Sequence, residues 1–293
     1  MHRPGFEPGY SAWKADIIAA RPSVHTGEVY MHLQSINIFG HSNIDNMTGA
    51  SQVKEEIRGI AAKYGIEVIG WLKLGDGIAI PGDEMGLLKG VKWANGEVDV
   101  SNVKNPRDIM PSAKAMIILG KRLMDDRCDI YYRVSDSYMA SVEMMLLDIA
   151  SLRTVECLRK NGFQGEEYTS YYLKAWAVLA GLGWIGKSMM FVSKEHGPRL
   201  RLKGVLTDAD LGVECEVLGD DSCGSCEECI KACPVGAISA EDVDRKKCAS
   251  CGLNHLKLRE NAYAYCIACT ACCPVGRSAP ASMGMVPNQY LGN

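Results

Sequence analysis

The chain has 293 residues, of which 47% are hydrophobic and 23% are charged, as is ordinary for a soluble globular protein with room for two domains. Its net charge of −3 provides no broad basic field for gripping nucleic acid. No secretory signal is visible. The longest charge-free apolar stretch, 175–186, has 12 residues, fewer than the roughly 20 that a membrane span needs. We therefore expect a cytoplasmic protein with no membrane partner.

The first half of the chain predicts alternating helices and strands. Residues 1–46 have no helical or strand rhythm, and we expect them to form a poorly ordered leader outside the natural mature chain. Apolar residues at helical spacing then predict a helix over 50–64, which Gly65 can close. Residues 66–74 and 113–120 predict strands, the second of them buried.

The pattern continues with two further helices and two further strands. A long helix is expected over 137–160, where Asn161-Gly162 stops it, and a shorter helix over 168–180. Strands are expected at 191–193 and 200–206. The alternation predicts an α/β layer structure for residues 47–214.

The cysteines are concentrated at one end of the chain. Eleven of the thirteen fall within residues 215–273, and this step in composition predicts a second domain over 215–293. In a cytosolic chain such cysteines indicate metal or redox chemistry rather than structural disulfides. Because the segment has only short helical pieces and few large apolar side chains, we expect bound clusters to hold it together.

Two cysteine runs have the spacing of bacterial ferredoxins. The first is C-x2-C-x2-C-x3-C-P, ending at Pro234, and the second is C-x2-C-x3-C-P, ending at Pro274. In two-cluster ferredoxins the last cysteine of a run ligates the other cluster. With the isolated Cys248, the runs supply eight thiolates for two [4Fe-4S] clusters. We predict one cluster on Cys223, Cys226, Cys229 and Cys273, and a second on Cys233, Cys248, Cys266 and Cys269.

Other chemistries use similar spacings. Zinc binds four thiolates from C-x2-C pairs, and a single C-x2-C can be a redox dithiol. Two repeated ferredoxin runs favour clusters over either alternative. Cys251 and Cys272 are surplus to the eight, and Cys251 is an alternative to Cys248 as the isolated ligand.

Residues 181–188, GLGWIGKS, match two phosphate-binding patterns at once. Both the P-loop and the dinucleotide fingerprint require a strand before the loop and a helix after it. Here the preceding residues have helical spacing and the following MMFVS predicts a strand, so the order is reversed. We therefore expect either a tight glycine turn or a close approach of the backbone to a flat ligand.

Three stretches together resemble the epoxyqueuosine reductase family and, more distantly, the reductive dehalogenases. They are AGLGWIGK at 180–187, HGPRLRLKGVLTDADL at 196–211 and the first ferredoxin run. The resemblance implies a nitroreductase-like α/β domain that holds a corrinoid (cobalamin), followed by a ferredoxin-like domain whose two [4Fe-4S] clusters deliver electrons to it. The corrinoid contacts that it implies are Tyr131, Gly181, Gly183, Trp184, Gly186, Lys187, Arg199, Thr207 and Asp208.

The resemblance also implies a catalytic acid. The family's proton donor is an aspartate that precedes a long helix, and Asp136 takes this position within the matching stretch 131–138. The glycine and the Tyr-His of the family pattern are absent here. The alternative role for Asp136 is to cap the N-terminus of the following helix.

The leading hypothesis is therefore a corrinoid and iron–sulfur reductase in which Asp136 is the general acid. It requires a low-potential electron donor of the ferredoxin or flavodoxin type. Because the chain ends 20 residues after Cys273, where family members that act on tRNA continue into a helical repeat, we expect a small-molecule or nucleoside substrate in preference to tRNA. The alternatives are an electron-transfer protein without its own substrate, and an activator that reduces the corrinoid of another protein.

Overall fold

The computed structural model describes the chain in segments. These are residues 49–75, the strand pair at 92–93 and 96–97, and residues 105–125, 128–136, 138–169, 173–212, 223–252 and 256–277. All of them belong to one compact unit, 47–293. The expected leader, 1–46, lies outside the described residues. No helix among these segments is long and apolar enough to cross a membrane.

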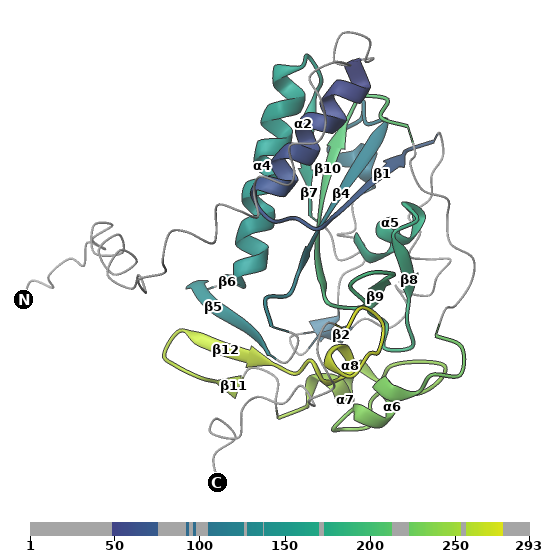
Figure 1. Ribbon diagram of the computed structural model, residues 1–293. Helices are drawn as coiled ribbons and strands as arrows, with labels where there is room; N and C mark the ends of the chain where they lie inside the picture. The colour runs from purple at the N-terminus through teal and green to yellow at the C-terminus, as the bar shows by residue number, and fades with distance from the viewer. Residues whose placement is uncertain are drawn as a thin grey trace, which may run out of the picture. The chain divides into compact units, whose positions relative to one another are not determined.

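A four-stranded antiparallel sheet forms the centre of the unit (Figure 1). Its strands follow the order β1 (Val68–Lys73), β4 (Ala115–Arg122), β10 (Leu200–Thr207) and β7 (Gly165–Tyr168). The sequence predicts β1, β4 and β10 within two residues of these bounds. β4 is buried along nearly its whole length, because strands pair with both of its edges and helices cover both faces of the sheet.

Side chains of β4 enter two hydrophobic cores, since successive side chains of a strand point to opposite faces. Ile117 packs into the core that includes residues of α2 (Gly49–Lys63) and α4 (Val142–Lys160). Ile118 packs into the core that includes residues of α5 (Leu173–Leu179). Figure 1 shows α2 and α4 on one side of the sheet and α5 on the other. The predicted α/β layering is confirmed.

The helix boundaries differ from the sequence prediction at two N-termini. α4 begins at Val142 rather than at residue 137, because Tyr138–Ala140 form the strand β6 and the hydroxyl oxygen of Ser141 caps the helix by accepting from the Met144 N–H at 3.4 Å. Capping by Asp136 is therefore wrong. The predicted C-terminus is correct: Asn161 is the C-cap, and Gly162 follows with a φ of 83°.

The helix predicted over 168–180 is shorter than expected. Tyr168 ends β7 and pairs with Gly204 of β10, so the residues before 169 belong to the sheet. α5 ends at Leu179, and Gly181 follows with a φ of 72°. The hairpin of β8 (Gly183–Ile185) and β9 (Phe191–Ser193) comes next. The predicted order of helix, glycine turn and strand is confirmed, and it is the reverse of a P-loop.

A second sheet, which the sequence did not predict, joins segments far apart in the chain. Its order is β11 (Leu256–Lys257), β12 (Ala262–Tyr265), β5 (Asp129–Ser135) and β6 (Tyr138–Ala140). β12 and β5 are antiparallel, with Tyr263 opposite Tyr131. The cysteine-bearing segment and the first part of the chain therefore share a sheet.

The remaining elements are short. They are β2 (Lys92–Trp93), β3 (Gly96–Glu97) and α3 (Pro106–Ile109) between β1 and β4, and α6 (Glu228–Ala232), α7 (Arg245–Ala249) and α8 (Ala268–Ala271) in the cysteine-rich segment. Neither α6 nor α7 contains a buried residue. Short helical pieces between cysteines were predicted, and the structure confirms them.

The tight β8–β9 pairing requires a glycine at position 183. A Cβ atom added there would lie 2.0 Å from the carbonyl oxygen of Val192. We expect Gly183→Ala to lower the free energy of unfolding by roughly 1–3 kcal/mol, the usual cost of overpacking. Gly59→Ala is the matched control, because Gly59 lies within α2 with open space around it; this change should stabilise the protein by about 0.5–1 kcal/mol. Urea unfolding of both variants measures the two effects, and equal stability of Gly183→Ala and wild type would contradict the packing argument.

Candidate functional site

The thiols that influence one another come from both cysteine runs. The thiol of Cys229 on α6 is influenced by the charges of Cys223, Cys226 and Cys273. We call these four residues the first group. Three of these residues belong to the first cysteine run, and the fourth, Cys273, belongs to the second run.

The second group is centred on Cys269 of α8. The charges of Cys266 and Cys248 act on the Cys269 thiol, and those of Cys233 and Cys251 act on Cys248. We call Cys233, Cys248, Cys266 and Cys269 the second group. Cys251 lies beside it, is buried, and hydrogen-bonds through its side chain with Cys266. Cys248 is exposed. Cys272 neighbours both groups, since Cys229 and Cys273 act on its thiol and Cys272 in turn acts on Cys269.

Burial is the largest influence on the pKa values of these thiols. It raises the pKa of Cys269 to about 12 and that of Cys266 to about 11, and neighbouring cysteines add to both shifts. Crowded thiols resist ionisation because each thiolate repels the next. A cationic centre removes this penalty by accepting the thiolates as ligands and releasing their protons.

The spacing of the thiols bears on the kind of metal centre. No three His, Cys, Asp or Glu side chains in the described segments converge closely enough to hold a single metal ion. The thiolates of a [4Fe-4S] cluster bind separate iron atoms and therefore stand further apart than those of one zinc ion, whose Zn–S bonds are about 2.3 Å.

Lys187, the lysine of the P-loop-like pattern, holds the first cysteine run in place. Its Nζ donates to the carbonyl oxygens of Gly224 at 2.7 Å and Cys226 at 3.1 Å. Gly186 lies against the same run: a Cβ atom there would be 3.4 Å from the Cys223 sulfur. The loop that follows α5 therefore binds the peptide backbone around the first group.

Arg199 anchors the end of the second run. Its guanidinium is fully buried and donates to the carbonyl oxygens of Val275 at 2.8 Å, Ala271 at 3.1 Å and Cys273 at 2.7 Å. Gly197 lies beside this contact with a φ of 60°, and a Cβ atom there would be 2.0 Å from the Val275 oxygen. The GPR stretch thus positions the segment that carries Cys273.

Other residues that the resemblance assigns to a corrinoid are placed apart from these. Thr207 donates to the Gln164 carbonyl at 2.8 Å, and Asp208 accepts from the Gln164 N–H at 2.8 Å. Both lie at the far end of β10 from Leu200, roughly 24 Å of extended strand away. The structure does not bring them together with Arg199 or the cysteines.

Asp136 lies at the tip of the β5–β6 hairpin. It is exposed, and the register of the two strands shifts between Arg133 and Ser135. Such an irregularity re-aims the residues next to it. The structure therefore presents Asp136 on a projecting turn.

Tyr131 of β5 belongs to a buried polar cluster that sequence reasoning missed in part. Its ring makes an edge contact with Tyr265 of β12 at a centroid distance of 4.7 Å, and the Arg201 guanidinium lies 5.1 Å from its centroid. Arg201 pairs with the buried Asp129. Burial raises the pKa of Tyr131 above its ordinary value, so this phenol stays protonated. Basic residues that alternate along the predicted strand 200–206, at positions 201 and 203, were the available signal for Arg201.

Lys174 of α5 is a second residue that the sequence prediction omitted. Its Nζ donates to the Met189 carbonyl at 3.2 Å and lies 3.6 Å from the Met190 sulfur. Burial, with a smaller effect of the Arg245 charge, lowers its pKa to about 8, and the charge of Cys269 opposes that shift. A single lysine in a largely apolar helix does not indicate from the sequence that the side chain of Lys174 is buried.

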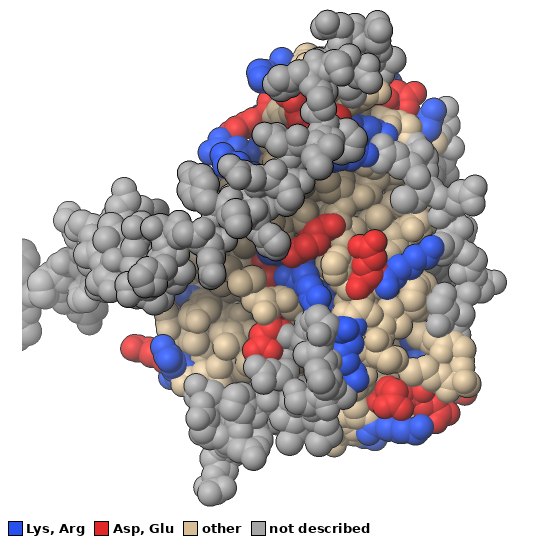
Figure 2. Space-filling view, in the orientation of Figure 1, with Lys and Arg blue, Asp and Glu red and all other residues tan. Residues whose placement is uncertain are grey.

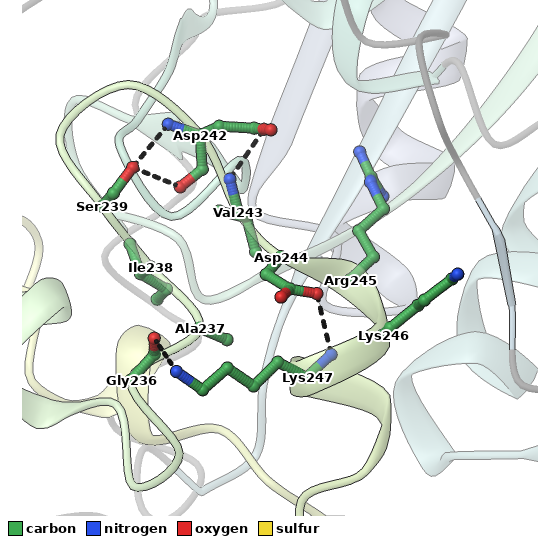
Figure 3. Close-up of a pocket in the computed structure, with 10 residues that line it drawn as sticks. All are labelled: Gly236, Ala237, Ile238, Ser239, Asp242, Val243, Asp244, Arg245, Lys246 and Lys247. Atoms are coloured by element: carbon green, nitrogen blue, oxygen red, sulfur yellow. Dashed lines mark hydrogen bonds between the residues drawn. The ribbon is translucent and has the colours of Figure 1, made fainter.

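The connection between Cys233 and Cys248 encloses an open pocket, which is drawn in Figure 3. Asp244 caps α7 by accepting from the Lys247 N–H at 2.9 Å, and the Lys247 ammonium reaches across to the Gly236 carbonyl at 3.0 Å. Ser239 and Asp242 form a turn opposite. These contacts hold the helix that carries Cys248.

The site and the fold together define an α/β protein with a ferredoxin-type iron–sulfur segment. A family model described as "4Fe-4S binding domain" matches residues 217–239, which contain all four cysteines of the first run.

Relatives with curated names identify a more specific likeness. The chain is 42% identical over 76 residues to an epoxyqueuosine reductase from Gloeobacter violaceus, over 26% of this chain and 23% of that protein. It is 37% identical over 111 residues to the epoxyqueuosine reductase from Vibrio cholerae, over 34% of this chain and 30% of that protein. The matched stretches thus span less than a third of those relatives. The predicted resemblance is confirmed over these stretches.

Solved structures extend the likeness to the fold. Epoxyqueuosine reductase from Bacillus subtilis, with its catalytic aspartate loop swung out of the active site, matches with a TM-score of 0.52 and 21% identity over 78% of this chain and 66% of that chain. An epoxyqueuosine reductase with an epoxyqueuosine-modified tRNA stem loop matches with a TM-score of 0.51 and 20% identity over the same shares. The chain shares their fold.

The buried Arg199 contacts lead to a stability prediction. Arg199→Met should lower the free energy of unfolding by at least about 3 kcal/mol, because three carbonyl oxygens lose their donor and unsatisfied buried groups cost roughly 1–3 kcal/mol each. Arg259→Met, on an exposed turn before β12, should stay within about 0.5 kcal/mol of wild type. Urea unfolding followed by tryptophan fluorescence compares the two. Equal midpoints would show that Arg199 does not anchor the second run.

Proposed function

We propose that this protein is an iron–sulfur oxidoreductase of the epoxyqueuosine reductase type, in which two [4Fe-4S] clusters deliver electrons to a bound cobalamin. The observation that carries the proposal is the exchange of one cysteine between the runs. Cys273 joins the first group and Cys233 joins the second, which is the arrangement of two-cluster ferredoxins. A single dithiol or an isolated C-x2-C pair gives no reason for such an exchange.

The donor sets fit two clusters. The first would be held by Cys223, Cys226, Cys229 and Cys273, and the second by Cys233, Cys248, Cys266 and Cys269. The residues around the thiols would not bind the metal themselves. Lys187 and Arg199 hold the two cysteine runs in place by donating hydrogen bonds to backbone carbonyl oxygens. Ligands kept in place in this way need little reorganisation when a cluster binds.

Two of the buried side-chain donors that lack a hydrogen-bond partner in the described segments could serve a corrinoid. The indole N–H of Trp184 and the Nε of Arg201 are buried and have no hydrogen-bond partner in the described segments. The amide carbonyls at the edge of a corrinoid are suitable acceptors. Trp184, Arg201 and Tyr131 would therefore hold the ligand, whereas Lys187 and Arg199 serve the cysteine runs. When bound, the cobalamin supplies a metal that can be reduced to a strongly nucleophilic state.

Asp136 is the proposed general acid. A carboxylic acid on an exposed turn could meet the substrate and give up its proton to a departing oxygen. The Bacillus subtilis relative is described with a catalytic aspartate loop that has swung out of its active site, and Asp136 lies on a comparable exposed turn. Tyr131 and Arg201, at the base of the hairpin, would orient the bound ligands.

The substrate that these similarities favour is epoxyqueuosine within tRNA. One of the structural neighbours carries an epoxyqueuosine-modified tRNA stem loop. On the face shown in Figure 2, basic and acidic side chains of the described residues are interspersed, so recognition would rest on a local contact with the stem loop rather than on a broad basic field. A ferredoxin or flavodoxin would supply the electrons, and a nitroreductase-like arrangement would hold the corrinoid.

Iron content tests the cluster assignment. Anaerobic reconstitution with iron and sulfide should give about eight iron atoms per wild-type chain, as two cubes require. Cys226→Ser should lose about half of that iron, because one of four ligands of the first cluster is removed. Cys157→Ser, on α4, should keep all of it. Iron analysis with electron paramagnetic resonance checks this. Zinc, or four iron atoms in wild type, would refute the two-cluster proposal.

Turnover tests the acid. Asp136→Asn should reduce the conversion of an epoxyqueuosine-modified tRNA stem loop at least about 100-fold, the low end of the contribution of general acids, while iron and cobalamin contents stay unchanged. Asp210→Asn removes a similar exposed carboxylate, paired with Lys73 at 3.6 Å, and should turn over normally. Nucleoside analysis by mass spectrometry measures the product. Undiminished conversion by Asp136→Asn would remove the assignment.

A further inference from the structure

The attachment of β5 to β12 ends three residues before Asp136. β5 lies between β6 and β12 in the second sheet (Figure 1). In the register of the pair, Ala262 at the start of β12 lies opposite Tyr132. The next backbone bond, from the Arg133 N–H to the Asn261 carbonyl oxygen at 2.8 Å, is the last between the two segments among the described residues. Arg133 therefore stands where the hairpin leaves β12.

The Arg133 side chain adds two contacts at the same point. Its Nη2 donates to the hydroxyl oxygen of Tyr263 at 3.2 Å, and its guanidinium carbon lies 5.3 Å from the centroid of the Tyr263 ring. A guanidinium at this distance from the face of an aromatic ring is attracted to it. Arg133 thus holds β5 against β12 through both its backbone and its side chain.

The backbone irregularity of the hairpin follows directly. The register of β5 and β6 shifts between Arg133 and Ser135, and such a shift re-aims the residues next to it. The direction in which Asp136 leaves the sheet therefore depends on how β5 is held just before the shift. The contacts of Arg133 with β12 lie at that point.

The other strand of the hairpin is attached to a different part of the protein. The Tyr138 hydroxyl of β6 donates to Asp148 Oδ2 on α4 at 3.5 Å, and Lys203 of β10 donates to the second oxygen of that carboxylate at 2.8 Å. The turn that carries Asp136 is therefore held on both sides, by Arg133 on β5 and by Tyr138 on β6.

We propose that Arg133 is a positioning residue for the general acid Asp136 and that it acts through Tyr263 of β12. This inference rests on the proposed function. A general acid must come within hydrogen-bond reach of the atom that it protonates, and small displacements from that geometry cost much of the rate. The contact also joins the acid to the cysteine-bearing segment, since Cys266, a proposed ligand of the second cluster, directly follows β12.

Hydrogen exchange of the anaerobic, reconstituted protein tests the contact itself. Peptides that cover residues 129–140 should exchange at least about threefold faster in Arg133→Met and in Tyr263→Phe than in wild type, because the hairpin opens from β12 more often. The double variant should exchange no faster than Arg133→Met alone, since both changes remove the same interaction.

Arg58→Met is the matched control for the exchange measurement. Its guanidinium also lies over an aromatic ring, 5.7 Å from the Trp71 centroid, but it stands on α2, away from the hairpin. The exchange of residues 129–140 should therefore stay at the wild-type rate in this variant. Unchanged exchange in both Arg133→Met and Tyr263→Phe would overturn the inference.

Steady-state conversion of the epoxyqueuosine-modified tRNA stem loop tests the consequence for Asp136. Arg133→Met should lower kcat by about 10- to 100-fold and leave KM unchanged, because Arg133 contacts β12 rather than the substrate. Arg133→Lys keeps a positive charge over the ring and should recover most of the rate. A merely structural role would lower the stability without this selective loss of kcat.

Two kinetic outcomes separate the inference from the proposed function. A raised KM with unchanged kcat in Arg133→Met would show that Arg133 binds the substrate, and it would overturn the positioning role. Wild-type protein that binds clusters and cobalamin but does not convert the stem loop would overturn the proposed function, and with it the role of Asp136. The exchange rates would still decide whether Arg133 holds the hairpin.

Discussion

The arrangement of the cysteine segment depends on one buried guanidinium. Arg199 stands immediately before β10, the inner strand next to β4, and its donors bind three carbonyl oxygens between Ala271 and Val275. This segment has no large apolar core of its own that could fix its position. A charged group inside a protein is tolerated where it is hydrogen-bonded, and the bonds from the two terminal nitrogens of Arg199 fix the position of Cys273. Arg199 thus ties the end of the second run, with Cys273, to the start of β10.

Sequence patterns predicted three of the four strands of the central sheet closely, for identifiable reasons, while the two ligand sets stay a prediction. β4 is a continuous apolar run, and α2 has apolar residues at helical spacing. Cluster ligands need fixed short spacings, which can be recognised directly in the sequence. The boundaries failed where tertiary pairing decided the structure. Glu166, Glu167 and Tyr168 join the sheet because β10 offers them an edge, and nothing local in their sequence requires it.

The second sheet and the polar cluster could not be predicted. β12 pairs with β5 across about 130 residues of chain, and strands of four to seven residues have weak periodic signals. Trp184 is of interest because its buried indole N–H has no hydrogen-bond partner in the described segments, and Lys174 because its ammonium contacts only a carbonyl and a thioether there. The glycine-rich stretch has the sequence pattern of a P-loop, but its helix comes before the loop and its strand after it. Lys187 therefore binds peptide carbonyls instead of phosphate.

The pairing of β5 with β12 also bears on how the protein matures. During synthesis, the hairpin that carries Asp136 emerges long before its partner strand, and it can complete its sheet only when residues 262–265 have left the ribosome. By then the first run and Cys248 have already been made, and only the last run remains. The turn that carries Asp136 and the cysteine-bearing segment therefore reach their final form together, late in translation, so a chain truncated before residue 262 would lack the β5–β12 pairing.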